Sequence, residues 1–192
     1  MTSSKAKLRT HKRQQRQAMD APAQRAAANA VSGLITQLPG WPSASRIALY
    51  LANDGELDTS SVEALCRNEG KQLFLPVIKA NNALEFARWD TNVTLQVNRF
   101  GIPEPDADAE RCCASALDIV ILPLVAWDLQ GGRLGMGGGF YDKALAGVSG
   151  PLLIGLAHTM QQVPCVPNEP WDVSMDFVVT DTALHCCKVD KN

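Results

Sequence analysis

The chain has 192 residues, of which 46% are hydrophobic, and its formal net charge at pH 7 is -2. This length predicts one domain, residues 1–192, with a substantial core. The small net charge argues against a nucleic-acid-binding protein, which needs an extended basic surface. The sequence has no apolar run of 18 residues, so we expect no membrane span, and its charged start does not resemble a secretory signal.

Cysteine usage points to a reducing compartment. The six cysteines include two adjacent pairs but no Cys-x-x-Cys motif, and no histidine spacing completes a zinc site. Reduced thiols are typical of the cytoplasm, where we therefore expect the protein to act. We also expect a monomer.

Positive charge is concentrated near the N-terminus. Residues 1–25 hold seven Lys/Arg and one Asp, which leaves 11 basic and 19 acidic residues for the rest. Residues 4–19 are predicted to form a helix that extends from the domain as a basic arm. Its basic residues recur at three- and four-residue steps and so share one face: Lys5, Arg9, Lys12, Arg13 and Arg16. This face is either solvated or closes over a polyphosphate.

Apolar runs alternate with helical segments along the rest of the chain. Strands are predicted at residues 46–51, 72–78, 84–89, 118–125, 151–157 and 177–180. Helices are predicted after Asp20, with Pro22 in the first turn, after Asp58 or Thr59, and from Tyr141. This order predicts an α/β fold, a three-layer sandwich with a mainly parallel, Rossmann-like sheet.

Two segments are expected to depart from the parallel pattern. Residues 84–89 alternate between apolar and polar side chains, which indicates a half-exposed strand at the sheet edge. Residues 98–113 contain Pro103 and Pro105, so we expect an irregular loop there. Phe100 in this loop either anchors it in the core or offers an exposed stacking surface.

Polar side chains follow the first strand, where ligands bind in parallel sheets. Glu56 and Asp58 are the two candidate carboxylates of this loop. Their spacing suits either ligand binding or capping of the next helix.

The most distinctive stretch is residues 131–142, which contains six of the 14 glycines. A buried strand precedes it and a helix start follows it, the arrangement that holds phosphates on backbone N–H groups. Arg133 adds a forked donor for phosphate oxygens. The stretch is neither a Walker loop nor Gly-x-Gly-x-x-Gly, and a flexible surface loop is the alternative.

These motifs together resemble the 5-formyltetrahydrofolate cyclo-ligase family, particularly its bacterial members. The resemblance spans nearly the whole chain and is carried by an ordered set of segments: Lys5 with Arg9, residues 55–59, residues 100–105, residues 123–128 with 132–142, Gln161, and Trp171 with Asp172. It implies the same α/β fold. It also implies ATP-dependent conversion of 5-formyltetrahydrofolate, with or without a polyglutamate tail, to 5,10-methenyltetrahydrofolate, ADP and phosphate.

The resemblance assigns roles to individual residues. Lys5, Arg9 and Arg133 would be catalytic through the phosphates, and Asp142 and Asp172 would hold Mg²⁺. The ATP-binding set would be Lys5, Arg9, Arg133, Leu134, Gly135, Met136, Gly137, Gly138, Gly139, Phe140 and Tyr141. Folate would contact Glu56 or Asp58, together with Phe100, Met136 and Phe140.

Two other functions are compatible with these residues. A relative that binds nucleotide or folate without turnover is one, although the presence of Arg133, Asp142 and Asp172 favours an enzyme. A phosphosugar or coenzyme A enzyme on a related fold is the other. It would need a catalytic carboxylate or lysine beside the phosphate loop, where Lys143 is the nearest lysine and is poorly placed.

Overall fold

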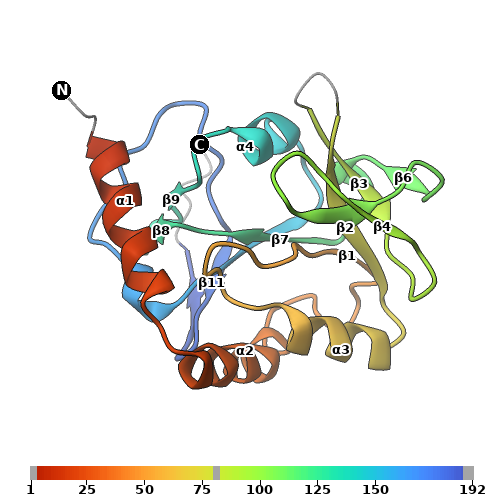
Figure 1. Cartoon of the computed structure of the whole chain (residues 1–192), viewed down its shortest axis with the longest axis horizontal. Helices are drawn as coiled ribbons and strands as arrows, with labels where there is room; N and C mark the ends of the chain where they lie inside the picture. The colour runs from red at the N-terminus through yellow and green to blue at the C-terminus, as the bar shows by residue number, and fades with distance from the viewer. Residues whose placement is uncertain (1–3, 80–82, 188–192) are drawn as a thin grey trace.

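A computed structural model describes residues 4–79 and 83–187, and these are built around one eight-stranded sheet (Figure 1). Five parallel strands form its centre, in the order β11 (Phe177–Val179), β10 (Leu152–Leu156), β7 (Ile119–Pro123), β1 (Arg46–Ala48) and β2 (Gln72–Ile78). Antiparallel strands complete both sides: β12 (Leu184–Cys186) next to β11, and β3 (Leu84–Arg88) followed by β6 (Arg111–Cys112) beyond β2. The predicted mainly parallel sheet is confirmed.

Helices cover both faces of this sheet. In Figure 1, α2 (Ala21–Ile35) and α3 (Ser60–Asn68) lie on one face and the short α4 (Phe140–Leu145) lies on the other. Successive strand residues point to opposite faces. Ile47 accordingly packs in the core beneath α2 and α3, and Ala48 packs in the core that contains Leu145 of α4. The three-layer α/β architecture is therefore as predicted.

The strand order reverses between β1 and β7. The chain runs from β1 through α3 to the neighbouring β2, and later places β7 on the other side of β1. From β7 it continues through α4 to β10. The two connections leave on opposite faces, so a crevice opens between the carboxyl ends of β1 and β7, where ligands bind in such sheets.

The segment of residues 98–113 is more regular than predicted. It contains β5 (Pro103–Pro105), which pairs with β4 (Leu95–Val97) in a separate two-stranded sheet, and then β6. The prolines stand at the two ends of a three-residue edge strand, where a missing N–H is tolerated. Because β6 pairs with β3, the prediction that residues 84–89 form the sheet edge is wrong.

The connection from β7 to α4 also differs from a simple strand–loop–helix unit. A hairpin of β8 (Ala126–Trp127) and β9 (Arg133–Leu134) interrupts it. Two-residue strands have too few positions for a periodic pattern, so the hairpin has no clear signal in the sequence. The short 3₁₀ helices η1 (Ala114–Ala116) and η2 (Thr159–Gln161) complete the described elements. No helix in these two ranges is long and apolar enough to cross a membrane.

Helix α1 (Ser4–Gln17) packs its basic face against the body of the domain. Lys12 and Arg16 are buried, although both are cations. Lys12 Nζ donates to the carbonyls of Met160 and Gln162, and burial lowers its pKa. The backbone oxygens at the end of η2 thus compensate part of the cost of removing this charge from water.

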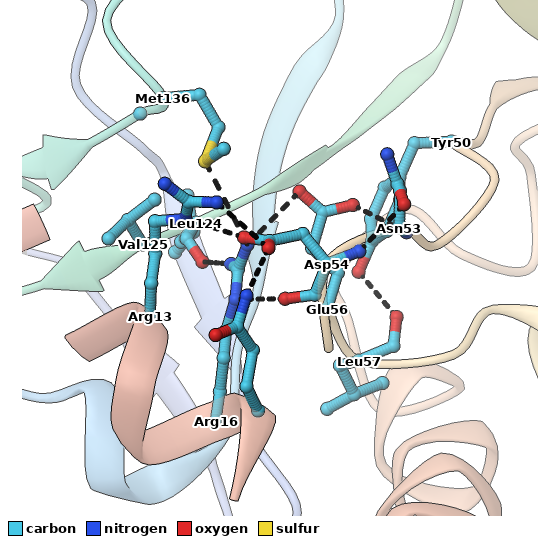
Figure 2. A network of polar contacts seen from close by, with 12 residues as sticks. Arg13, Arg16, Tyr50, Asn53, Asp54, Glu56, Leu57, Leu124, Val125 and Met136 are labelled. Atoms are coloured by element: carbon cyan, nitrogen blue, oxygen red, sulfur yellow. Dashed lines mark hydrogen bonds and ion pairs between the residues drawn. The ribbon is translucent and has the colours of Figure 1, made fainter. Parts of the chain in front are cut away.

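Asp54 holds the other end of α1 in place (Figure 2). Its carboxylate accepts hydrogen bonds from Arg13 Nε at 2.7 Å and Nη2 at 2.9 Å, and from Arg16 Nη2 at 2.7 Å. The Arg13 contact is the main reason that the pKa of Asp54 lies far below its usual range, and Arg16 lowers it further against the opposing effect of burial. Asp54 is therefore ionised at any physiological pH.

We expect this ion pair to make the stability of the fold sensitive to acid. The pKa of Asp54 is lower in the folded chain than in the unfolded chain, so its contribution is complete above about pH 4 and is lost at lower pH. Asp54→Asn should lower the free energy of unfolding by about 2 kcal/mol at neutral pH. In urea titrations at several pH values, that difference from the unmodified chain should shrink progressively in acid.

The matched control is Asp108→Asn, since Asp108 lies on an exposed loop. It should leave the free energy of unfolding within about 0.5 kcal/mol. A deficit for Asp54→Asn that stays constant down to strongly acidic pH would contradict the assignment of the ion pair.

Candidate active site

The β8–β9 hairpin that carries Arg133 is organised by a buried carboxylate. Asp128 is 3% exposed, and it accepts hydrogen bonds from the amides of Gln130 at 3.0 Å, Gly132 at 2.9 Å and Val166 at 2.7 Å. A Cβ on Gly132 would lie 2.6 Å from Asp128 Oδ2, and one on Gly131 would lie 2.6 Å from the carbonyl oxygen of Met175. These two glycines permit close packing in the hairpin, so the accessible glycine loop begins after Leu134.

Arg133 connects three parts of the chain. Its side chain is 4% exposed, its Nη2 donates to Asp142 Oδ1 in α4, and its Nε donates to the carbonyl of Val173 at 3.2 Å. The same carboxylate oxygen of Asp142 accepts the amide of Val173 at 3.0 Å. The guanidinium is thereby fixed beside the start of α4, at the end of the glycine loop.

The accessible glycine loop, residues 135–139, lies beside α1. Arg9 Nε donates to the carbonyl of Gly135 at 2.8 Å, and its guanidinium carbon would be 3.6 Å from a Cβ on Gly137. Gly137 and Gly139 have positive φ angles of 103° and 64°, which L side chains rarely adopt. Gly138 lies close to the ring of Phe140, and Met136 is 51% exposed.

Leu134 and Tyr141 delimit this loop and differ from its exposed centre. Leu134 is buried in a small cluster with Val125 and Val166, so its side chain faces away from any ligand. Tyr141 is half-buried, and burial together with the charge of Glu56 raises its pKa.

The two expected metal ligands are each paired with a cation of the chain. Asp172 Oδ2 accepts Lys5 Nζ at 2.8 Å and the amide of Glu169 at 2.9 Å. Burial raises the pKa of Asp172, but these hydrogen bonds and the charge of Arg133 outweigh it and the net shift is downward. Asp142 is paired with Arg133. Within the described ranges no three His, Cys, Asp or Glu side chains converge in a metal-binding arrangement.

Glu56 and Asp58 have different environments. The side chain of Glu56 is 11% exposed, its Oε2 accepts the amide of Asn53 at 3.0 Å, and its Oε1 lies 3.8 Å from Arg16 Nη2. Burial raises the pKa of Glu56 above that of an ordinary glutamate. Asp58 is exposed, and its Oδ1 accepts the amide of Ser60 at 2.6 Å at the start of α3. Thr59 is the N-cap residue of α3, and Asp58, one position earlier, satisfies the first amide of the helix, whereas Glu56 faces inward.

Two tyrosines adjoin Glu56. The hydroxyl of Tyr50 donates to the carbonyl of Leu57 at 2.7 Å, which fixes the start of the loop after β1. Burial is the main cause of the raised pKa of Tyr50 and of Tyr141, and the charge of Glu56 adds to it in both. Both phenols therefore stay protonated and neutral.

Phe100 lies on the surface, in the turn between β4 and β5. It is 49% exposed, so the alternative in which it anchors the loop in the core is wrong. Its ring packs edge to face on Phe140, with centroids 5.8 Å apart and planes at 76°. This contact brings the loop of residues 98–102 to the start of α4. The Arg99 guanidinium lies over the Phe100 ring, 5.0 Å from its centroid, and the rest of the exposed ring surface is available for stacking.

Two residues that organise this region had no role assigned from the sequence: Gln161 was noted only as part of the family resemblance, and Arg16 only as part of the basic stripe. Gln161 is buried; it donates to the carbonyls of Leu124 and Val125 and accepts the amide of His158 at 2.8 Å. It therefore joins the segments that follow β7 and β10. Arg16 was recognised only as a member of the basic stripe, because helical spacing defines a shared face but not which member becomes buried.

Comparison with known proteins identifies the family of the chain. A sequence profile of the 5-formyltetrahydrofolate cyclo-ligase family matches residues 1–181. A 5-formyltetrahydrofolate cyclo-ligase of Haemophilus influenzae is 36% identical over 179 residues, which cover 91% of this chain and 96% of the relative. One from Escherichia coli is 37% identical over 179 residues, with 90% and 97% coverage.

A solved structure agrees with these sequence matches. The NMR structure of Aquifex aeolicus 5,10-methenyltetrahydrofolate synthetase superimposes with a TM-score of 0.85 at 29% identity, and covers 99% of this chain and 96% of its own. The chain therefore belongs to the 5-formyltetrahydrofolate cyclo-ligase family and is an enzyme of that family.

Proposed function

We propose that the enzyme converts 5-formyltetrahydrofolate to 5,10-methenyltetrahydrofolate at the expense of ATP. The observation that carries this proposal is the meeting of two charge pairs, Lys5–Asp172 and Arg133–Asp142, at the ends of a glycine loop. Cations for phosphate oxygens and carboxylates for a metal are there together. The half-buried Glu56 and the exposed ring of Phe100 supply groups for a pterin nearby.

The chemistry explains why such a site needs ATP. An N-formyl group is an amide and therefore a poor electrophile. Transfer of the γ-phosphoryl group to the formyl oxygen, with departure of ADP, turns that oxygen into a leaving group. The folate N10 then attacks the formyl carbon, the N10 proton is lost and phosphate departs. The protein has to position the reactants and stabilise phosphoryl charge, without a nucleophilic side chain.

The residues divide this work between them. Arg9 reaches from α1 to Gly135 of the loop and Lys5 reaches to Asp172, and both would bind phosphate oxygens together with the amides of residues 135–139. Arg133 would stabilise the transferred phosphoryl group from a buried position, where its charge is poorly screened. Phe100, Phe140 and Met136 would form the apolar wall against the folate ring.

The carboxylates of Asp142 and Asp172 suit Mg²⁺, which binds proteins through one or two carboxylates together with substrate phosphates. Asp142 is paired with Arg133, and Asp172 is paired with Lys5. When ATP binds, its phosphate oxygens would accept hydrogen bonds from these two cations, and the carboxylates would become available to the metal. Bound there, Mg²⁺ would neutralise phosphate charge and so favour phosphoryl transfer.

We also infer that the enzyme acts as a monomer in the cytoplasm. The Lys5–Asp172 and Arg133–Asp142 pairs form within the chain, so the proposed phosphate site is complete without a second copy, which supports the first statement. All six cysteines are free, which suits a reducing compartment and supports the second.

The direct test follows formation of the methenyl product by its near-ultraviolet absorbance. The absorbance should rise when the protein is mixed with 5-formyltetrahydrofolate, ATP and Mg²⁺. Omission of ATP, or chelation of the metal, should abolish the rise. If the folded full-length chain releases no phosphate and forms no methenyl product under these conditions, the proposal is refuted.

Arg133→Ala tests the phosphoryl site. It should lower kcat/KM by at least about 100-fold, the scale seen when a preorganised charge donor is removed. Lys143→Ala is the matched control, because Lys143 is an exposed base only ten residues away on α4 and should leave kcat/KM within about twofold. Thermal denaturation of each variant would separate loss of fold from loss of catalysis. Equal kinetics in the two variants would contradict the role of Arg133.

Glu56→Gln and Asp58→Ala distinguish the two candidate pterin-binding carboxylates of the loop after β1. Glu56→Gln should raise KM for 5-formyltetrahydrofolate at least about tenfold, because a charged hydrogen-bond acceptor is lost. Asp58→Ala should leave this KM unchanged and lower the free energy of unfolding by about 1 kcal/mol, the value of a helix cap. The reverse pattern would assign pterin binding to Asp58.

A further inference from the structure

Arg16 is a fully buried arginine at the crevice between β1 and β7 (Figure 2). Its Nε donates to the carbonyl of Asp54 at 2.8 Å, on the loop after β1, and its Nη1 donates to the carbonyl of Leu124 at 3.1 Å, just after β7. Its Nη2 lies 3.8 Å from the sulfur of Met136 in the glycine loop. One guanidinium therefore links the three segments that surround the crevice.

Glu56 depends on this guanidinium for its charge balance. The contact at 3.8 Å between Glu56 Oε1 and Arg16 Nη2 is the only ion pair that Glu56 forms among residues 4–79 and 83–187. In Figure 2 the side chains of Glu56 and Arg16 lie side by side. The Asp54 carboxylate lies between this pair and Arg13. Burial raises the pKa of Glu56; the hydrogen bond from the Asn53 amide opposes that rise most, and the charge of Arg16 opposes it as well.

The other groups around Glu56 do not replace this charge. Asp54, on the same loop, is an anion and raises the pKa of Glu56 further. Tyr50 after β1 and Tyr141 of α4 are neutral phenols. His158, which follows β10, interacts with Arg16, and burial lowers its pKa and favours its neutral form. The amide of Asn53 orients Glu56 Oε2 but carries no net charge.

We propose that Arg16 is a positioning residue for folate binding, which holds the Glu56 carboxylate ionised and in the orientation that accepts hydrogen bonds from the N–H groups of the pterin ring. This inference rests on the proposed function and extends it to a residue on α1. Arg16 acts through Glu56 and the loop after β1. Its guanidinium is fully buried and held by its own carbonyl and carboxylate partners, so we assign it no direct contact with the ligand.

When Arg16 is replaced, the carbonyl of Asp54 loses the Arg16 Nε–H, but the Asp54 carboxylate and the carbonyl of Leu124 retain other donors. Asp54 keeps Arg13 and Gln17, and the carbonyl of Leu124 keeps Gln161. Glu56 is the group that loses its cation. A substitution of Arg16 should therefore affect folate binding more than the docking of α1, to which Lys12 and Arg13 still contribute.

The experiment compares Arg16→Met, Arg16→Lys and the matched control Arg13→Met, which removes the other arginine on Asp54 but no partner of Glu56. KM for 5-formyltetrahydrofolate, KM for ATP and kcat are measured from about pH 5 to about pH 9. Arg16→Met should raise KM for the folate roughly tenfold or more, because a buried carboxylate loses its cation. KM for ATP should stay within about twofold for all three variants.

The pH profile gives a readout that a purely structural role would not change. Without Arg16, the pKa of Glu56 rises, so the acid limb of kcat/KM for the folate should move to higher pH. Arg16→Lys should return the limb toward its original position, because an ammonium restores the charge although it lacks the fork. Arg13→Met should leave the limb where it is. A limb that does not move in Arg16→Met would overturn the inference.

A double-mutant cycle links Arg16 to Glu56. On a Glu56→Gln background, Arg16→Met should change KM for the folate by less than about threefold, since there is no longer a carboxylate to hold. The same large loss on both backgrounds would show that Arg16 acts elsewhere and would overturn the inference. If Arg16→Met does not fold, Arg16→Gln, which also removes the charge, takes its place in the cycle with Glu56→Gln.

Failure of the proposed function has a different signature. If the unmodified enzyme forms no methenyl product, the function is wrong, and calorimetric titration of the same variants with 5-formyltetrahydrofolate then decides the role of Arg16. Weaker binding in Arg16→Met, with the unchanged affinity of Arg13→Met, would support it. Equal affinities, or no binding by the unmodified chain, would overturn it.

Discussion

The site depends on burial of positive charge at the carboxyl edge of the sheet. A lone buried cation would cost several kcal/mol, and Lys12 and Arg16 avoid that cost by donating to backbone carbonyls and to Asp54. Those acceptors belong to segments that follow separate strands. Helix α1 is consequently a structural part of the crevice, although it is the first element of the chain and precedes every strand. Its basic side chains reach the glycine loop because this docking holds the helix in place.

Much of the fold could be predicted because local patterns carry it. Branched apolar runs marked the parallel strands, and Asp20 with Pro22 marked the start of α2, where the Asp20 side chain accepts the amide of Ala23. Gly70, with φ of 69°, follows the end of α3 as a helix cap. The elements that were missed are very short strands that are held only by pairing with another strand. Neither β6 nor β12 has more than three residues, and each forms only against a neighbouring strand.

The sequence indicated which residues to expect in the proposed site better than it indicated the contacts between them. Residue types and spacing drew attention to the basic stripe with Lys5, to Arg133 and to the carboxylates Glu56 and Asp58, and the family resemblance gave them expected roles toward ATP and folate. Spacing could not show that Arg133 and Lys5 each form an ion pair with an acidic residue, because those partners come together only in the folded chain. Nor could it distinguish Arg13, which is partly exposed, from Arg16 one turn later, which is fully buried. That difference depends on where β7 ends beneath the helix.

The segment just after β7 packs closely on β10, and this packing requires a glycine at position 155. The side chain of Leu124 packs so closely on β10 that a Cβ on Gly155 would lie 2.5 Å from Leu124 Cδ1. The carbonyl of the same leucine is the acceptor for both Arg16 and Gln161. A methyl group at position 155 would push Leu124 away from β10 and disturb both hydrogen bonds. Gly155 lies in the middle of a buried strand, away from the loops of the site. It nevertheless sets how closely Leu124 approaches β10, and through that spacing the shape of the crevice.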